Sequence, residues 1–488
     1  MKPIVTMREA LASSELFAPL IGGDSWASWR VLLIAIMGEP LTAAERETFR
    51  TLTGRDREPG EPVDEFWGVI GRRGGKSRAI SILAAYIAAL VDHRVVLGPG
   101  ERGVLPILAA SVDQAQAVFN FIGGVFDSVP RLGALVSTRT ADSLSLRTGV
   151  DIRVRPASFR TIRSITAVAA IADEVAFWRS DETTNPDQEI LAALRPSLLT
   201  TRGALFCISS PHAKKGELWR SYREHYGPNG DPKILVVAAA SIVMNATLPS
   251  KEIERAYARD AARASAEYGG KFRDDIEDFL SITDLDQLVV RGRGEIPPEA
   301  GVDYVGFCDP SGGKADSMTL AIAHQTEGKV VLDLIAEERP PFSPDAVVQD
   351  FAAILKSYRL TKVTGDRYGG IWPTERFEKH GIKYVASEMP KSEIYRTALP
   401  LFTAGTVELL DNSRMASQFC SLERRVNRGG KDSIDHPTGG NDDVCNSVAG
   451  ALCLANILAP EFYTEAMLKG MAALCYGMGS DRDRFFAS

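Results

Sequence analysis

The chain has 488 residues, more than one hydrophobic core normally organises, so we expect two domains and connecting segments. Hydrophobic residues make up 45% and charged residues 24%, which is ordinary for a soluble globular protein. The formal net charge of −7 argues against a protein coated with basic residues. It leaves room for a local patch such as residues 147–163, whose arginines form either a DNA contact or a solvated face.

Membrane and secretion signals are absent from the sequence. The apolar run ILAAYIAALV (82–91) is about half the length that crosses a bilayer. The first residues, MKPIVTMREALASSELF, have no apolar signal core with a small-residue cleavage site. The six cysteines are scattered without metal-ligand spacing, so we interpret them as reduced and mostly buried. We expect a cytosolic protein that is neither secreted nor embedded in a membrane.

Between residues 65 and 240, apolar segments bounded by turn signals alternate with helical patterns. This alternation is typical of a sheet with helices on its faces, so we predict an α/β fold. The predicted strands are 66–71, 104–111, 150–158, 167–178 and 203–211, and the predicted helices are 77–92 and 113–129.

The segment GRRGGKS (71–77) joins the first predicted strand to the first predicted helix. Free backbone N–H groups and the helix dipole favour an anion at such a junction. The phosphate-loop pattern G-x-x-x-x-G-K-[ST] requires a glycine where Ile70 stands, but its end matches Gly75, Lys76 and Ser77. We predict that Lys76 binds the β- and γ-phosphates of ATP. The nucleotide-binding residues that we predict are Arg72, Arg73, Gly74, Gly75, Lys76, Ser77 and Asp173.

An acidic pair, Asp173 and Glu174, ends the apolar segment VAAIADE (168–174). Phosphoryl transfer needs Mg²⁺ held by a carboxylate at a strand end, and many ATPases place a glutamate beside it to orient the attacking water. We predict that Ser77 and Asp173 bind Mg²⁺ and that Glu174 is the catalytic residue. This half of the chain is therefore predicted to be a P-loop ATPase of the RecA/ASCE-like kind.

The segment CISSPH (207–212) follows at the end of the next predicted strand. Helicase-like ATPases place small hydroxyl residues at this point, next to the γ-phosphate, so that hydrolysis affects the rest of the molecule. Ser209 and Ser210 are therefore candidates for coupling. The alternative is an ordinary turn before Pro211.

The second half follows a change in pattern. A charged helical stretch at 251–281 precedes VRGRGEIPPEAG (290–301), which is rich in glycine, proline and charge. We predict a domain boundary near 295. The predicted divisions are an ATPase domain at 1–245, a helical linker at 246–295, a second domain at 296–460 and a C-terminal tail at 461–488.

Three consecutive strands are predicted within 304–338, followed by a helix at 344–358, a strand at 361–366 and further helices. Asp309 closes the first strand and Asp366 closes the fourth. Carboxylates at these strand ends and at the start of a late helix, on a βββαβα order, are the RNase H arrangement. The second domain is therefore predicted to be an RNase H-like nuclease.

Such carboxylates cluster because one acid alone does not hold a hard divalent ion. Two divalent metals, Mg²⁺ or Mn²⁺, about 4 Å apart activate water and stabilise the leaving oxygen in phosphodiester hydrolysis. The predicted metal ligands are Asp309, Asp366, Asp442 and Asp443. We predict Asp309, Asp366 and Asp443 as catalytic, and favour Asp443 over Asp442 because it lies one step further into the helix at 439–458. The alternatives are a turn at Asp309 and a helix N-cap at Asp442.

Together the two halves resemble the large terminase subunit of tailed bacteriophages and prophages, over roughly residues 30–460. The resemblance rests on the segments GRRGGKS, AAIADEVAFW, CISSP, GFCDPSGGKADS, VTGDRYGG and SIDHPTGGNDDVCNSVAGAL. The last segment is the most specific, since its His-Pro…Asp-Asp helix opening is typical of the family's nuclease domain. The family's phosphate loop commonly carries an arginine, which Arg72 matches.

The resemblance implies an ATP-driven motor that moves double-stranded DNA into a procapsid and an endonuclease that cuts the concatemer. It implies a portal protein and a small terminase subunit as partners. It also implies a homo-oligomeric ring on the procapsid, formed in the host cytoplasm by a chain that is monomeric in solution. In this family the region corresponding to the tail at 461–488 often docks on the portal.

Two other functions are alternatives to this one. A DNA-repair or defence helicase–nuclease shares the ATPase chemistry, but it usually carries a second RecA-like domain between motor and nuclease. Only about 50 residues separate the two predicted domains. A non-catalytic assembly scaffold would have degenerate sites, whereas Lys76, Glu174, Asp309, Asp366 and Asp443 are all present.

Overall fold

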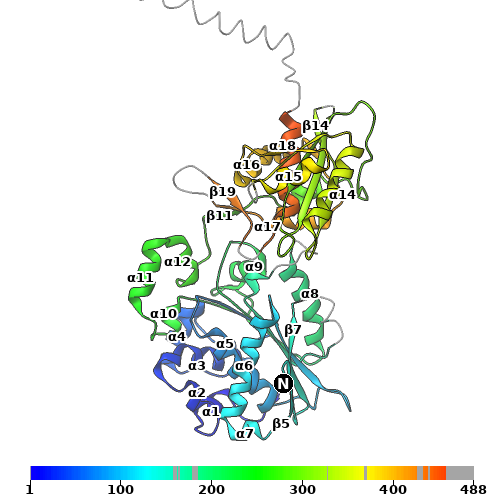
Figure 1. Cartoon of the computed structure of the whole chain (residues 1–488). Coiled ribbons are helices and arrows are strands. Elements are labelled where there is room, and N and C mark those ends of the chain that lie inside the picture. The colour runs from blue at the N-terminus through cyan, green and yellow to red at the C-terminus, as the bar shows by residue number, and fades with distance from the viewer. Residues whose placement is uncertain are drawn as a thin grey trace, which may run out of the picture. The chain divides into compact units, whose positions relative to one another are not determined.

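The computed structural model describes residues 2–157, 162, 165–178, 185–326, 328–367, 371–425, 432–437 and 440–457 (Figure 1). The chain divides into two compact units. Unit 1 is Met1–Glu277 with Arg425–Lys431, and unit 2 is Asp278–Arg424 with Asp432–Ser488. The predicted tail at 461–488 lies outside the described residues. Within the described ranges, none of the helices combines the length and apolar character needed to cross a bilayer.

Unit 1 is built on an eight-stranded sheet. Its strands are β2 (Glu65–Ile70), β4 (Gly103–Ala109), β5 (Val136–Arg139), β6 (Ser143–Leu146), β7 (Val150–Pro156), β8 (Ala169–Asp173), β9 (Ala204–Ser209) and β10 (Ile234–Ala239). They lie in the order β10-β2-β9-β8-β4-β7-β6-β5. The strands from β10 to β7 in this order pair in parallel with their neighbours. Strand β6 pairs with β7 in the antiparallel direction, and β5 pairs with β6 in the same way. Strand β9 therefore separates the strand before the phosphate loop from the strand that ends in Asp173, which is the P-loop arrangement of the ASCE kind.

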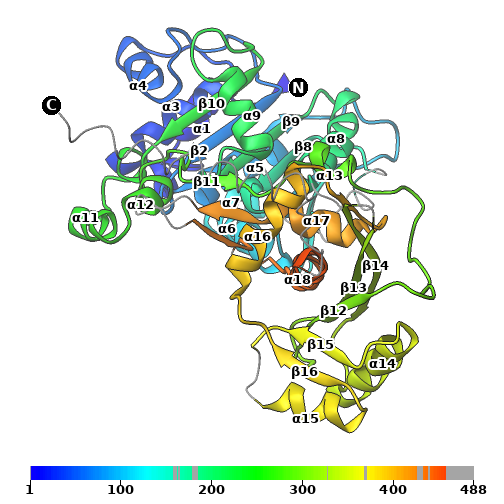
Figure 2. The same ribbon diagram turned by 90° about the horizontal axis from the view of Figure 1, so that it is seen from above.

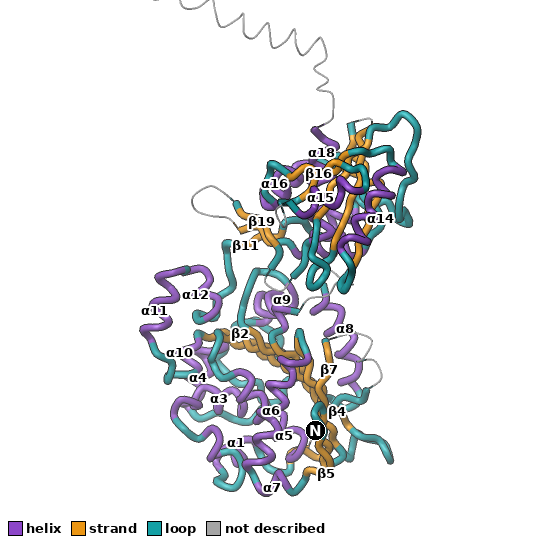
Figure 3. The backbone as a smooth tube through the Cα atoms, in the orientation of Figure 1, coloured by secondary structure: helices purple, strands orange, loops and turns teal. Residues whose placement is uncertain are grey.

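Helices cover both faces of this sheet, as Figure 3 shows. The helices of unit 1 are α1 (Met7–Ala12), α2 (Ala18–Ile21), α3 (Ala27–Ile36), α4 (Ala43–Thr53), α5 (Lys76–Leu90), α6 (Val112–Ser128), α7 (Pro130–Gly133), α8 (Pro186–Leu199), α9 (Gly216–His225), α10 (Ser241–Met244), α11 (Ser250–Arg259) and α12 (Ala261–Glu267). Short 3₁₀ turns lie at η1 (Asp24–Trp26) and η3 (Val175–Phe177), and β1 (Lys2–Pro3) pairs with β3 (Val91–Asp92).

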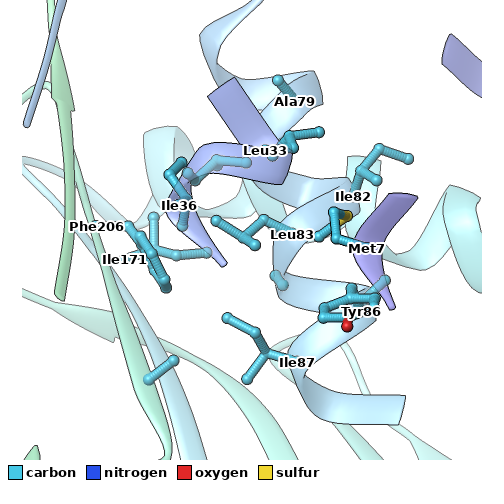
Figure 4. Packing of buried hydrophobic residues seen from close by; sticks show 14 of the residues in the cluster. Met7, Leu33, Ile36, Ala79, Ile82, Leu83, Tyr86, Ile87, Ile171 and Phe206 are labelled. Carbon is cyan, nitrogen blue, oxygen red and sulfur yellow. The ribbon is translucent and has the colours of Figure 1, made fainter. Parts of the chain in front are cut away.

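The central strands are apolar on both faces because each face packs against helices. In β2, Phe66 joins the core under α3, α5 and α6, whereas the next residue, Trp67, joins the core under α8 and α9. Figure 4 shows the first of these cores, where Ile171 and Phe206 from the sheet lie toward Ile36 and Leu83. Unit 1 is therefore a three-layer α/β/α structure, and the predicted fold class is confirmed for this half.

Unit 2 is built on a six-stranded sheet. Its strands are β12 (Tyr304–Asp309), β13 (Met318–Thr326), β14 (Lys329–Glu338), β15 (Lys362–Gly365), β16 (Lys383–Ala386) and β17 (Val407–Glu408). They lie in the order β16-β15-β12-β13-β14-β17. Strands β12, β13 and β14 are antiparallel, and β15 pairs with β12 in parallel. This is the predicted βββαβα arrangement, so the RNase H-like fold is confirmed.

The helices of unit 2 also lie on two faces of their sheet. They are α13 (Ile282–Asp286), α14 (Pro344–Ser357), α15 (Trp372–Lys379), α16 (Lys391–Thr403), α17 (Ser413–Ser421) and α18 (Asp443–Ile457). Helix α18 runs beside β12 and β13 and packs against α16 and α17, as seen in Figure 2. On the other face, α14 and α15 cover Cys308, Leu320 and Ile322. A small three-stranded sheet has the strands β11 (Ile276–Asp278), β18 (Glu423–Arg425) and β19 (Ser433–Asp435).

Two sequence-based expectations differ from the structure. The strand predicted at 167–178 ends at Asp173, because Glu174 has a left-handed φ of 48° and η3 follows. The domain boundary predicted near 295 lies instead between Glu277 and Asp278. The carbonyls of Glu267 and Tyr268 accept hydrogen bonds from Arg72 and Ser241 of unit 1, whereas Phe279 already belongs to the core of unit 2. The helical linker predicted at 246–295 is thus divided between the two units.

A glycine on α18 sets the distance between that helix and β12. A Cβ atom added to Gly450 would lie 2.4 Å from ring atoms of Phe307, so no side chain fits there without movement. We predict that Gly450→Ala destabilises unit 2 by about 1–3 kcal/mol, as overpacked core substitutions do, despite the better helix propensity of alanine. Denaturant unfolding monitored by circular dichroism measures the change.

Gly294→Ala is the matched control, because an added Cβ meets no atom within 4 Å there. Its stability should equal that of the wild type within about 0.5 kcal/mol, the usual range for a surface change. A Gly450→Ala variant as stable as this control would show that α18 and β12 separate freely.

Two candidate active sites

The first candidate site forms around the phosphate loop between β2 and α5. Gly75 precedes α5 with a φ of 83°, a left-handed conformation that glycine adopts at no steric cost. The indole Nε1 of Trp29 donates to the carbonyl oxygen of Gly74 at 2.7 Å. A Cβ on Gly75 would lie 3.1 Å from atoms of both Trp26 and Trp29. Two tryptophans from the N-terminal helices therefore hold the loop backbone in place.

The opposite side of the loop is held by the segment after β10. Ser241 Oγ donates to the carbonyl oxygen of Arg72 at 2.6 Å, and Asn245 Nδ2 donates to that of Arg73 at 3.1 Å. Both arginines are exposed, and one Arg72 guanidinium nitrogen lies 3.8 Å from Glu267. Their backbone is fixed, while their side chains are available to solvent or to a ligand.

Lys76 brings the predicted elements of the ATPase site together. Its side chain is only 6% exposed, and its Nζ donates to Ile70 O and to Ser210 Oγ, each at 2.9 Å. The same Nζ lies 3.5 Å from Glu174 Oε1. Ser209 Oγ and the Ser210 N–H donate to Glu174 Oε2 at 3.1 and 3.0 Å. The two serines proposed for coupling thus contact the predicted catalytic glutamate, and their role stays a prediction.

Asp173 has the properties of a metal-binding carboxylate. Burial raises its pKa to about 7, and the neighbouring Glu174 carboxylate adds to the increase. Its Oδ1 is buried and has no hydrogen-bond partner among the described residues. A buried carboxylate with an open oxygen fits Mg²⁺, whose preferred ligands are oxygens. Ser77, half-buried in the first turn of α5, offers a hydroxyl oxygen.

The second candidate site lies where β12 and β15 end and α18 begins. Asp309 is the last residue of β12, Asp366 follows β15, and the Asp366 N–H donates to Cys308 O at 3.2 Å. Asp443 is the first residue of α18. The carboxylates line a cavity of about 220 Å³ together with Pro310, Ser311, Asp316, Ser317, Lys391, His436, Gly440, Asn441 and Asp442.

The two adjacent aspartates at the start of α18 have different surroundings. Asp442 is buried and paired with Lys391 Nζ at 2.9 Å, and it accepts a hydrogen bond from Tyr395 at 2.8 Å. Asp443 has no basic partner this close among the described residues, and its Oδ2 accepts only the Ser317 N–H, at 3.2 Å. This difference favours Asp443 over Asp442 as a metal ligand, because fewer partners occupy the carboxylate oxygens of Asp443.

Burial and neighbouring like charges raise the pKa of two of these carboxylates, Asp309 and Asp443. Burial raises the pKa of Asp443 to about 6, with Asp442 and Asp316 adding to the increase. The pKa of Asp309 is also raised by burial, against a hydrogen bond from Asn446 that lowers it. Among the described residues no three acidic, histidine or cysteine side chains are grouped closely enough to form a finished metal site. The acids share a cavity that divalent cations would fit by charge and ligand type.

Two residues of this site were missed in the sequence. Asn446 donates from Nδ2 to Asp309 Oδ2 at 2.8 Å and to Asp366 Oδ2 at 3.5 Å. Its signal was its place three residues after Asp443, on the same helical face. Lys391, at the start of α16, carries no local signal because its partner Asp442 lies far along the chain.

The arginine-rich stretch at 147–163 is partly neutralised within unit 1. Buried Asp151 pairs with Arg102 and with Arg153, each at 2.7 Å. Arg147 is exposed, and Arg160 and Arg163 lie outside the described residues. The choice between a DNA contact and a solvated face therefore stays open.

No protein-family model matches the sequence, and no curated protein matches it. Among solved structures, the chain is similar to the large terminase of bacteriophage HK97, with 16% identity and a TM-score of 0.38 over 87% of this chain and 99% of that chain. It is also similar to the ATPase domain of the Thermus phage P74-26 large terminase, with 17% identity and a TM-score of 0.34 over 43% of this chain and 89% of that chain.

A third similar structure is the large terminase nuclease from thermophilic phage G20c, with 16% identity and a TM-score of 0.30. This match covers 35% of this chain and 95% of that chain. Solved large terminases are thus similar to most of the chain. Since the identities and TM-scores are low, function is inferred from the geometry of the two sites.

The raised pKa of Asp443 predicts an effect on stability. A folded-state pKa of about 6, against an ordinary value of 3.8, means that the folded chain holds this proton at a pH where the unfolded chain has released it. Stability therefore falls as pH rises from about 4 to about 6 and stays reduced above that range. We predict that Asp443→Asn, which cannot ionise, raises the melting temperature by a few degrees at pH 7.5 in metal-free buffer.

The measurement is thermal unfolding of both proteins with EDTA at pH 4 and pH 7.5. The advantage of Asp443→Asn should be small at pH 4, where Asp443 is protonated in the folded chain. An advantage that is equal at both values, or a variant that is less stable at pH 7.5, would contradict the assigned pKa shift.

Proposed function

We propose that this chain is the large terminase subunit of a tailed bacteriophage or prophage, an ATP-driven DNA-packaging motor and endonuclease. The observation that carries the proposal is the union of two sites in one chain. Unit 1 gathers Lys76, Glu174 and Ser210 at a phosphate loop, and unit 2 lines a cavity with carboxylates from β12, β15 and α18. The motifs quoted from the sequence support the same family.

In the ATPase site, Lys76 exchanges its contacts with Ile70, Ser210 and Glu174 for the β- and γ-phosphates of ATP. Release from Lys76 leaves Glu174 able to orient the attacking water, and Ser209 and Ser210 sense the change through their hydrogen bonds to this glutamate. Ser77 and Asp173 would hold Mg²⁺, which would neutralise charge on the transferred phosphoryl group. Arg72 and Arg73 add positive charge to the loop.

In the nuclease site, Asp309, Asp366 and Asp443 would hold divalent cations, with Asp442 beside them. Two such cations, Mg²⁺ or Mn²⁺, would supply an activated water and stabilise the leaving oxygen of a phosphodiester. Lys391 holds Asp442 through the 2.9 Å ion pair and keeps its carboxylate directed at the ammonium group. The substrate that we propose is concatemeric double-stranded DNA.

The partners that we propose follow from this assignment. They are double-stranded DNA, a portal protein and a small terminase subunit, with a homo-oligomeric ring on the procapsid formed from a chain that is monomeric in solution. The site of action is the host cytoplasm, with transient docking at the portal. The tail at 461–488 is the proposed portal contact.

A helicase–nuclease fits less well. Its second RecA-like domain would lie between the motor and the nuclease, but between β10 and β12 the described chain holds only α10 to α13 and β11. A non-catalytic scaffold has no need of the buried, unpartnered Asp173 Oδ1. Both observations favour a packaging enzyme.

ATP hydrolysis is the first test. Lys76→Ala should lose nucleotide binding, because it removes the buried ammonium group of the phosphate loop. Glu174→Gln should bind ATP but hydrolyse it at least ~100-fold more slowly, as expected for loss of a positioned proton-transfer group. Phosphate release and fluorescent-nucleotide binding measure the two effects. Wild-type turnover in Glu174→Gln would remove this residue from its role.

Metal-dependent DNA cleavage is the second test. The purified chain should nick and linearise plasmid DNA with Mn²⁺ or Mg²⁺, and EDTA should stop it. Asp366→Ala should abolish cleavage yet keep ATPase activity, because the two sites lie in different units. Loss of both activities in a folded variant would refute this division, and packaging into procapsids with portal protein would separate the terminase from a general nuclease.

A further inference from the structure

Asn446 lies inside the group of carboxylates of unit 2 without being one of them. It stands on α18, three residues after Asp443, and its side chain is fully buried. Its Nδ2 donates to Asp309 Oδ2 at 2.8 Å and lies 3.5 Å from Asp366 Oδ2. One amide group therefore contacts the two carboxylates that end β12 and follow β15.

The orientation of this amide is set by its neighbours. If its oxygen and nitrogen were exchanged, a carbonyl oxygen would face two carboxylate oxygens, which is repulsive. In the observed orientation, the buried Oδ1 has no hydrogen-bond partner among the described residues. Leaving a buried amide oxygen without a hydrogen-bond partner costs free energy. The hydrogen bonds donated by Nδ2 therefore stabilise this orientation by more than that cost.

A neutral donor suits this position better than a basic side chain. Two carboxylates brought together by strand pairing repel each other, and a hydrogen-bond donor reduces that repulsion. A lysine or arginine at this position would also reduce the repulsion, but its permanent positive charge would compete with a metal ion for the same carboxylate oxygens. An amide orients the pair and occupies one oxygen of Asp309, while the other oxygen stays available.

We propose that Asn446 is a positioning residue that holds Asp309 and Asp366 in the geometry needed to bind a divalent cation. This inference rests on the proposed nuclease function of the same site. Asn446 contacts the two carboxylates directly, so its loss should lower the affinity of the site for the metal ion. Groups that orient metal ligands typically change affinity or activity by roughly 10–100-fold when removed.

The experiment compares two variants with opposite packing effects, Asn446→Leu, which fills the space, and Asn446→Ala, which empties it. Binding of Mn²⁺ to the full chain without nucleotide is measured by titration calorimetry, and Asp366→Ala defines the signal that belongs to this site. Both variants should weaken Mn²⁺ binding by roughly 10–100-fold. Both should also need correspondingly more Mn²⁺ for half-maximal plasmid cleavage, with the rate at saturating Mn²⁺ largely recovered.

Gln418→Leu is the matched control. Gln418 is another buried amide, and its Oε1 accepts the Cys445 N–H at the start of α18 at 3.0 Å. It contacts α18 one residue before Asn446. The control should keep wild-type Mn²⁺ affinity even if its melting temperature falls, and ATPase activity should persist in every variant that folds.

Several outcomes would overturn the inference. Wild-type Mn²⁺ affinity in Asn446→Leu or Asn446→Ala would do so, as would an equal loss in Gln418→Leu. A wild-type chain without any Asp366-dependent Mn²⁺ binding would also overturn it. If the wild type binds Mn²⁺ through Asp366 and the variants bind it more weakly, but no DNA is cut, the positioning role stands and the proposed nuclease function fails.

Discussion

Parallel pairing of neighbouring strands is the constraint on which both sites depend. The carboxyl ends of parallel neighbours lie at the same edge of a sheet, so residues far apart in sequence meet there. In unit 2, Cys308 and Gly365 are register partners, so Asp309 and Asp366, the next residues of their chains, lie side by side. In unit 1, β9 pairs in parallel with both β2 and β8, so Lys76, Glu174 and Ser210 converge beyond the three strand ends.

Both sites also place a helix start opposite those strand ends. In unit 1 the turn at Gly75 leads directly into α5, so Lys76 is both the first residue of the helix and the cation of the site. In unit 2, Asp443 begins α18 and faces the loop at Ser317. The start of a helix carries partial positive charge, which favours phosphates in the first case and a carboxylate in the second.

The order of elements was predictable because periodicity is a local property. The strands predicted at 66–71 and 203–211 and the helices predicted at 77–92 and 439–458 follow from short apolar patterns, and the acids at the strand ends follow with them. Contacts between segments that lie far apart in the chain could not be predicted from the sequence. Lys391 meets Asp442 only because α16 packs on α18. Trp29 supports Gly74 only because α3 lies against the loop. The boundary at Glu277 likewise depends on which core Phe279 enters.

The two sites meet the same electrostatic problem with different groups. Each buries acids that repel one another, and each needs a partner for them before any ligand arrives. Unit 1 uses the permanent cation of Lys76, which lies 3.5 Å from Glu174 and which an incoming nucleotide can take over because the phosphates carry the opposite charge. The proposed function of unit 2 requires its site to take up a cation, and a permanent positive charge at the centre of the site would compete with that ion. The neutral amide of Asn446 donates to Asp309 and Asp366 without neutralising their charge, which the proposed metal ion would do. Among the described residues that line this cavity, the lysine is Lys391, and it pairs with Asp442 rather than with Asp309 or Asp366.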